Sequence, residues 1–416
     1  NHKINYLLII ILPLLWSSMN HKINYLLIII LPLLWSSMNH KINYLLIIIL
    51  PLLWSSCSRQ TEEILPPTGP VYGWEEGAVG FGTVSRSGGM YAEEDFLHNT
   101  FIHNESYLRI YNYTGSTLDF TDTGLYKWYV YDENLSNLTG NQYNFRPLEG
   151  RGFLWEEIKT GGSGYIFDAV VFPRFHTYRN EIYPDQQEFD HFLASDILMA
   201  HHIQDRENFG KRVAFKFHHV LTMLQVEIYV PKYDPKTNTG FEKKALANVV
   251  LPELYTKFTF NASAALTSDE APTVTTHTAG NHPGDCPQTD IRMYPRYNVE
   301  DFSDVKEGKD KEGEEGRDCY IYPLTAILPL QIIDSDKTLL RVTLKTKEGV
   351  NKTYRYIPGK LSTPISFQAG HITYLKLTLS KEENKAFLIK AEVKPWGKAS
   401  ADMSLEKEEN NQSTGK

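Results

Sequence analysis

Apolar and polar residues alternate with a period of two near the end of the chain, which is the pattern of half-buried β-strands. It is clearest in HITYLKLTLS (371–380) and AFLIKAEVKPW (386–396), and the KEEN segment between them predicts a hairpin turn. The residues predicted to face inward are Leu375, Leu377 and Leu379 in the first strand, and Phe387, Ile389, Ala391 and Val393 in the second. Each strand therefore has one face for the core and one for water.

The same scheme recurs earlier in the chain. LLRVTLKT (339–346) repeats it, while in VAFKFHHVLTMLQVEIYV (213–230) the inward phase shifts between His219 and Leu224, which predicts a β-bulge near Thr222. Further predicted strands cover 77–86, 106–114, 127–133 and 164–175. Because dry faces must meet another sheet, the sequence predicts an all-β protein built of β-sandwiches.

The length suggests more than one core. Residues 57–416 are too many for one ordinary domain, and a polar stretch separates the strands before and after residue 208. We predict a tether at 57–72, an N-terminal β-sandwich domain at 73–208, a C-terminal β-sandwich domain at 209–398 and a polar tail at 399–416.

The first 56 residues repeat one segment three times. Each copy of NHKINYLLIIILPLLWSS has a lysine, an apolar run and small residues, the order of a secretory signal. The run is shorter than the roughly 20 apolar residues that a membrane-spanning helix needs. We interpret 1–37 as duplication in the recorded chain, Met38 as the initiator and 38–56 as the signal.

Only the third copy ends in a cysteine, Cys57. Trp54-Ser55-Ser56-Cys57 resembles the lipobox of bacterial lipoproteins, in which a cysteine receives acyl chains after cleavage. The alternative is an ordinary signal with an incidental cysteine. Lipidation would attach the exported protein to the outer membrane, because acyl chains bury many methylene groups in the bilayer.

The net charge bears on the kind of partner, and the two other cysteines bear on a possible disulfide. Without the three leader lysines the chain has 39 basic and 50 acidic residues, a net charge near −11, which disfavours a nucleic-acid partner. Cys286 and Cys319 either pair in a disulfide across a charged loop or remain two free thiols.

The common catalytic motifs are missing from the sequence. It contains no G-x-S-x-G, H-E-x-x-H or phosphate-binding glycine loop. The doublets His201-His202 and His218-His219 present one histidine to each face of a strand, so we interpret them as core or rim histidines rather than metal ligands. We predict a protein that is not an enzyme and that needs no cofactor or metal.

Three stretches together resemble the fimbrillin-like family, the type V pilins and related surface lipoproteins of Bacteroidetes. They are SDILMAHH followed by VAFKFHHVLTMLQVEIYV, then ISFQAGHITYLKLTLS, and finally IKAEVKPW. VGFGTVSRS resembles the first strand of family members, which precedes a processing arginine, here Arg86. The resemblance implies two tandem transthyretin-like (Ig-like Greek-key) sandwiches, a lipidated precursor, and proteolytic removal of the first strand.

Removal of an edge strand would leave unpaired backbone groups and a dry groove for the strand of another pilin subunit. The chain's own tail is a weak donor, because its alternating residues are mostly small: Ala399, Ala401, Met403 and Leu405. A tip or accessory subunit therefore fits as well as a stalk subunit, with the receptor left open. Two alternatives are a lipid-anchored carbohydrate-binding module, favoured by aromatic residues such as Tyr72 and Trp74, and a hydrolase with unrecognised carboxylates.

Overall fold

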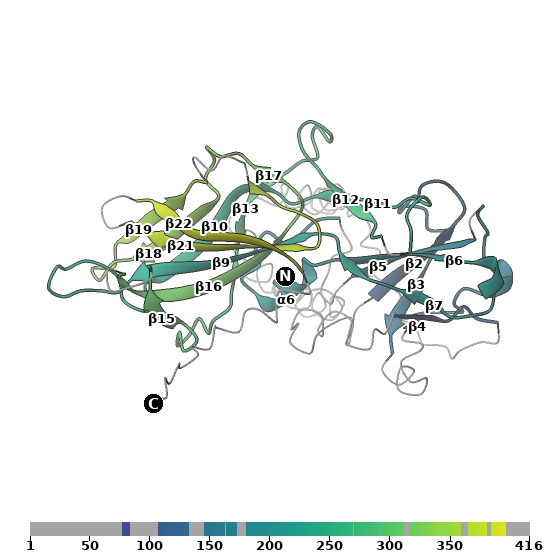
Figure 1. Cartoon of the computed structure of the whole chain (residues 1–416), viewed down its shortest axis with the longest axis horizontal. Coiled ribbons are helices and arrows are strands. Elements are labelled where there is room, and N and C mark those ends of the chain that lie inside the picture. Colours follow the sequence, from purple (N-terminus) through teal and green to yellow (C-terminus); the bar gives the residue numbers. More distant parts are fainter. Residues whose placement is uncertain are drawn as a thin grey trace, which may run out of the picture. The chain divides into compact units, whose positions relative to one another are not determined.

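The computed structural model describes residues 77–83, 107–132, 145–162, 164–172, 180–268, 270–311, 316–358, 365–380 and 384–396. Strands dominate these residues, with one α-helix and two short 3-10 helices among them, so the prediction of an all-β protein is confirmed (Figure 1). The helical elements are η1 Trp155–Glu157, α6 Phe189–Ala194 and η2 Arg206–Asn208.

The largest sheet has eight strands in the order β7-β1-β4-β3-β2-β5-β6-β8. Their bounds are β1 Phe81–Thr83, β2 Tyr107–Tyr113, β3 Tyr126–Tyr131, β4 Phe145–Pro147, β5 Tyr165–Phe172, β6 Leu198–Gln204, β7 Val213–Phe215 and β8 His218–His219. We call this the first sheet. Every residue of its central strand β5 is buried, so both faces of the sheet are covered.

A six-stranded sheet has the order β14-β16-β9-β21-β22, with β15 also paired to β16. Its strands are β9 Thr222–Pro231, β14 Tyr294–Pro295, β15 Lys306–Lys309, β16 Asp318–Leu328, β21 His371–Leu379 and β22 Ala386–Pro395. We call it the second sheet. Strands β9 and β16 pair antiparallel along ten residues, and β21 runs parallel to β9 on its other side (Figure 1).

A four-stranded sheet, order β13-β10-β18-β19, contributes its alternate apolar residues to the same core as the second sheet. Its strands are β10 Leu246–Tyr255, β13 Gln288–Arg292, β18 Leu340–Lys345 and β19 Asn351–Tyr356. Leu340, Val342 and Leu344 are buried as predicted. Two small pairs complete the described strands: β11 Phe258–Asn261 with β12 Thr273–Thr276, and β17 Ile332–Ile333 with β20 Ile365–Ser366.

The segment 213–230 does not contain the predicted bulge near Thr222. Instead β7 and β8 pair within the first sheet, and β9 begins the second sheet at Thr222. The shift in hydrophobic phase therefore marks a change of sheet, since each sheet sets the inward face of its own strands. The domain boundary after residue 208 stays a prediction, and the strands of the first sheet extend past it to His219.

The prediction that Phe387, Ile389, Ala391 and Val393 of β22 are buried is wrong, because all four are exposed. Opposite Lys376 and Leu377 the register shifts, so that Lys390 and Leu388 are their partners and Ile389 is left over. Such a bulge reverses the phase of a strand. Leu388, rather than Phe387, therefore shares the buried side of Leu377, and Phe387 and Ile389 are exposed.

Candidate functional site: the slot around strand β1

Strand β1 has a partner on each side. Phe81 pairs antiparallel with Phe145 of β4, and residues 81–83 pair in parallel with β7 from Val213 to Phe215. The expectation that this strand forms the edge of its sheet is therefore wrong. The reason is that β7, which comes much later in the sequence, covers the edge that β1 would otherwise present. We call the space between β4 and β7 the β1 slot.

The residues just before β1 are also tied to the body of the protein. The amide of Val79 donates to the carbonyl of Phe153 (2.8 Å), and the amide of Trp155 donates to the carbonyl of Gly77 (3.0 Å). On the other side, the amide of Val213 donates to the carbonyl of Gly80 (2.8 Å). The slot thus holds the extended segment 78–83, preceded by a turn at Gly77, through backbone hydrogen bonds on both flanks.

Phe81 is the apolar anchor of this segment, and its side chain has no exposed surface. Its ring meets Tyr129 and Phe167 edge to face, at centroid distances of 5.1 and 5.5 Å, and stacks on Phe215 at 5.6 Å. Edge-to-face and offset-stacked rings at such distances attract one another beyond the effect of burial alone. The slot is therefore shaped for one large aromatic side chain.

Tyr129 also contacts Phe153, the residue that binds the start of the β1 segment. Its hydroxyl oxygen accepts a hydrogen bond from the amide of Phe153 (2.8 Å), the residue whose carbonyl receives the amide of Val79. Burial raises the pKa of Tyr129 above its ordinary value, so the hydroxyl stays protonated and neutral. Tyr129 thus places a neutral, hydrogen-bonded side chain beside the Phe81 ring, as suits an apolar anchor.

The predicted site residues are only partly visible. Cys57 and Arg86 lie outside the described residues, and Arg86 follows β1 by three residues. Cys286 and Cys319 are free thiols in the structure, which is the second of the two alternatives that the sequence left open. Cys319 is buried in β16, where burial raises its pKa to about 12, whereas Cys286 lies in the partly exposed loop before β13.

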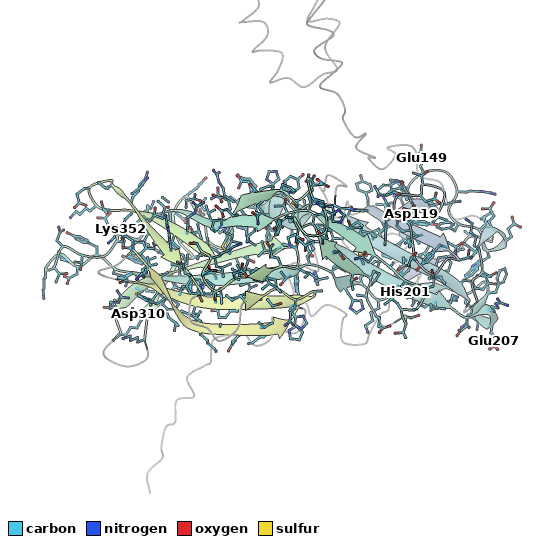
Figure 2. All side chains as sticks on the ribbon, turned by 90° about the horizontal axis from the view of Figure 1, so that it is seen from above. Asp119, Glu149, His201, Glu207, Asp310 and Lys352 are labelled. Carbon is cyan, nitrogen blue, oxygen red and sulfur yellow. The ribbon has the colours of Figure 1, made fainter. Side chains whose placement is uncertain are left out.

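The histidine doublet of β6 divides between the two faces of the first sheet, as predicted. His201, labelled in Figure 2, is completely buried, with Nδ1 3.0 Å from a carboxylate oxygen of Asp168 on β5. His202 turns to the opposite face and bonds Gln204. The Asp168 partner was missed, although an aspartate in the apolar run YIFDAVVF was a signal that something must satisfy it.

Burial raises the pKa of Asp168, and the contact with His201 offsets part of this shift. The unfolded chain loses this proton near pH 3.9, the usual value for aspartate, whereas the folded chain keeps it to higher pH. Asp168 therefore makes the protein less stable as the pH rises through that interval.

We expect Asp168→Asn to remove this dependence. The free energy of unfolding of the wild type, minus that of the variant, should fall between pH 4 and pH 8 in chemical denaturation. The exposed Asp336→Asn serves as control, and its difference should stay level. A rising difference for Asp168→Asn would contradict the assignment.

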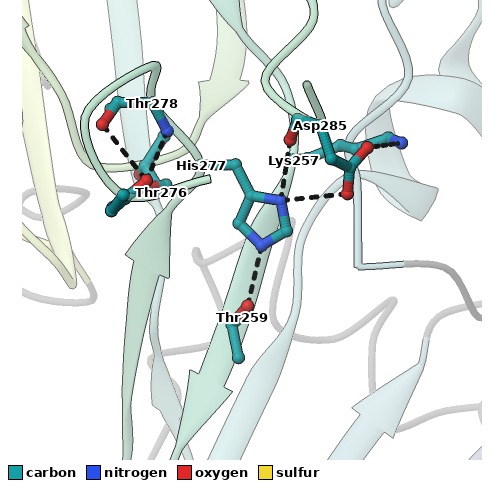
Figure 3. Close-up of polar contacts among 7 residues, drawn as sticks. Lys257, Thr259, Thr276, His277, Thr278 and Asp285 are labelled. Atoms are coloured by element: carbon teal, nitrogen blue, oxygen red, sulfur yellow. Dashed lines mark hydrogen bonds and ion pairs between the residues drawn. The ribbon is translucent and has the colours of Figure 1, made fainter. Parts of the chain in front are cut away.

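A second polar cluster fastens the β11–β12 hairpin to the loop that follows it (Figure 3). Asp285 receives Lys257 Nζ at 2.6 Å and lies 3.4 Å from Nδ1 of His277. Nε2 of His277 lies 2.7 Å from the hydroxyl of Thr259, and the His282 ring stacks on His277 at 3.7 Å. Both nitrogens of His277 are thus engaged within the protein, so we interpret the cluster as structural.

Within the described part of the chain, no group of three or more histidine, cysteine, aspartate or glutamate side chains is arranged to hold a metal ion. Over the same residues, no helix has the length and apolar character needed to cross a membrane.

Comparison with known proteins agrees with the strand pattern. A family model described as fimbrillin-like matches residues 165–396, which is more than half of the chain. No curated protein matches the sequence.

Several solved structures match the chain at low sequence identity. A proposed cell adhesion protein from Bacteroides uniformis is 16% identical, with 77% of this chain and 98% of that chain covered and a TM-score of 0.43. A fimbrial protein from Bacteroides vulgatus is 10% identical, with 76% and 99% covered and a TM-score of 0.35. The tip fimbrial protein Mfa3 from Porphyromonas gingivalis, truncated at its C-terminus, is 10% identical, with 71% and 96% covered and a TM-score of 0.32.

Proposed function

Because this chain belongs to the fimbrillin-like family, we propose that it is a pilus-associated adhesion protein that joins its neighbours by strand exchange at the β1 slot. Family membership implies a place on the extracellular surface, as part of a fimbria. The observation that carries the finer proposal is the pairing of β1 on both sides around a fully buried Phe81.

Loss of β1 would leave two rows of unpaired backbone groups, one on β4 and one on β7. Such rows bind an extended segment from another chain, because main-chain hydrogen bonds supply affinity whatever the side chains are. A slot with two walls holds its guest more firmly than a single edge, since the guest can bond on both flanks. Strand β1 is therefore a replaceable element that also completes the sheet.

The anchor gives the exchange its selectivity. Full burial of a phenylalanine stabilises a fold by about 1.5–3 kcal/mol relative to exposure. A donor strand with a large apolar residue at the position of Phe81 recovers this energy, whereas a donor with small residues leaves a cavity. The incoming strand should therefore carry an aromatic or a long aliphatic side chain.

Processing supplies the trigger for exchange. The sequence supports export through the 38–56 signal, lipid attachment at Cys57 to the outer membrane, and cleavage after Arg86, three residues beyond β1. Cleavage there would separate 57–86 from the body and leave β1 held by non-covalent contacts alone. A donor strand could then displace it.

The chain's own tail matches the slot poorly. Its largest apolar residues in the alternating stretch are Met403 and Leu405, and it has no aromatic residue after Trp396. We propose that the chain accepts a strand more readily than it donates one. This suits a tip or accessory subunit, and it makes another pilin the expected donor.

Treatment with an arginine-specific protease tests this function. We expect a cut after Arg86, retention of the fragment that contains β1 until mild denaturant is added, and then oligomers that survive gel filtration. An Arg86→Lys variant is the matched control, because it keeps the charge but resists the protease, and it should stay monomeric. Oligomers that form equally from the uncut control, or a cut body that never binds a second strand, would contradict the proposal.

A further inference from the structure

Apolar side chains are exposed along strand β22. Phe387, Ile389 and Val393 are 48, 41 and 50% exposed, and they are three of the eight large apolar residues exposed in the described part of the chain. Exposed apolar residues that gather on one strand mark a contact surface more often than scattered ones do.

The outer edge of β22 also offers backbone groups. β22 is the last strand of the second sheet, and within the described sheets it pairs with β21 alone. Just after β22, the amide of Trp396 donates to the carbonyl of Gly370 (2.7 Å), so the backbone groups of Trp396 face β21. Going back along the strand, the backbone groups of every second residue, Lys394, Glu392 and Lys390, face the same way. By the alternation of antiparallel pairs, the backbone groups of Ala391 and Val393 point away from β21.

We propose that a second copy of this chain pairs with β22 through this edge, antiparallel and about a two-fold axis at Ala391. In this register Lys390 of each copy lies opposite Glu392 of the other, and Ile389 lies opposite Val393. These two kinds of pair are oppositely charged and apolar on both sides, respectively, and pairs of both kinds stabilise a sheet. Beyond them, past the bulge at Ile389, Leu388 lies opposite Lys394. The two copies meet through the same patch, as a two-fold interface requires.

The neighbouring registers are worse. A two-fold axis at Lys390 sets the two Lys390 side chains against each other, and an axis at Glu392 opposes the two Glu392 side chains and brings Lys390 opposite Lys394. Like charges directly opposite each other destabilise a sheet. A two-fold axis at Val393 pairs Glu392 with Lys394 but sets Ala391 opposite Pro395, which has no amide hydrogen to donate. The sequence of β22 therefore favours the register centred on Ala391.

The pairing is short, because the bulge at Ile389 ends the regular ladder on one side and Pro395, which has no amide hydrogen, ends it on the other. A contact of this size falls in the range of weak and transient interfaces. It becomes populated where copies are concentrated, as on a crowded surface. The inference does not depend on the β1 slot, which lies in the other sheet.

Cysteine cross-linking tests the register in the full chain with Cys57 and Cys286 replaced by serine. The axis brings the two copies of residue 391 to a Cα distance of about 5.5 Å, within disulfide range. Ala391→Cys should therefore form a disulfide dimer at least about tenfold faster than Val350→Cys, a position that is also exposed but lies away from β22. Equal rates for the two variants would overturn the proposal.

A charge exchange tests the pairing itself. Lys390→Glu sets like charges opposite each other and should weaken dimerisation by about tenfold, and Lys390→Glu with Glu392→Lys should restore it. Dimerisation is read by analytical ultracentrifugation, with circular dichroism to show that each variant is folded. Failure of the double variant to restore the dimer would overturn the proposal, as would a dimer that appears only after residues 397–416 are removed, since the tail would then be the occupant of this edge.

Discussion

Replacement of Phe81 by alanine should lower the free energy of unfolding by about 3–5 kcal/mol, the usual loss when a buried aromatic side chain is truncated. The ring has no exposed surface and lies among four other aromatic rings, so its loss leaves a cavity in an apolar surrounding. Urea denaturation at neutral pH measures the loss.

The same substitution should make β1 easier to displace. After cleavage at Arg86, the Phe81→Ala fragment should leave the body at a lower denaturant concentration than the wild-type fragment. Phe209→Ala is the matched control, since Phe209 is 52% exposed and its truncation should remove about 1 kcal/mol or less. A Phe81→Ala variant no less stable than Phe209→Ala would show that the slot does not depend on its anchor.

The strand pattern could be predicted from sequence because burial on one face enforces a period of two. Leu375, Leu377 and Leu379 are buried as their alternation indicates, and so are Leu340, Val342 and Leu344. These strands each belong to one sheet along their whole length, so one phase describes them. The all-β fold followed from such strands without any knowledge of their partners.

The strand pattern gave wrong predictions where a bulge or a change of sheet is determined by residues outside the strand itself. The bulge in β22 is set by its pairing with β21, and the alternation of Phe387 and Ile389 gave no sign of it. Between β8 and β9 the shift of hydrophobic phase was visible in the sequence, but its cause was not, because a change of sheet and a bulge produce the same shift. Spatial partners are needed to distinguish the two.

For the candidate site, the sequence predicted the strand that occupies the slot but not the strands that flank it. Residues 77–83 were recognised as a strand, yet β7, the strand that covers its outer edge, is only three residues long and lies more than a hundred residues later. Pairings between distant segments are fixed by tertiary packing, which local patterns do not encode. The same holds for Asp168 and His201, which meet only because β5 and β6 pair in one register.

Replacement of Trp396 by alanine should have an effect of similar size, about 3–5 kcal/mol in the free energy of unfolding. Trp396 follows β22 of the second sheet, yet its indole stacks on His219 of the first sheet, with ring centroids 3.7 Å apart and planes at 4°. Asp196 lies 2.8 Å from Nδ1 of His219 and holds that ring in place. The stack thus ties the end of the last strand to the other sheet, so its loss should loosen both together.

Trp396→Phe keeps a ring against His219 and should lose clearly less stability than Trp396→Ala in the same urea titration. A double-mutant cycle with His219→Ala should give a coupling energy of about 0.5–1.5 kcal/mol, the range for stacked rings beyond burial. Additive effects of the two alanine substitutions would mean that the stack of the two rings contributes no interaction energy of its own. A clear coupling would mean that the stack fixes Trp396, at the end of the last strand, to the first sheet, which also contains the β1 slot.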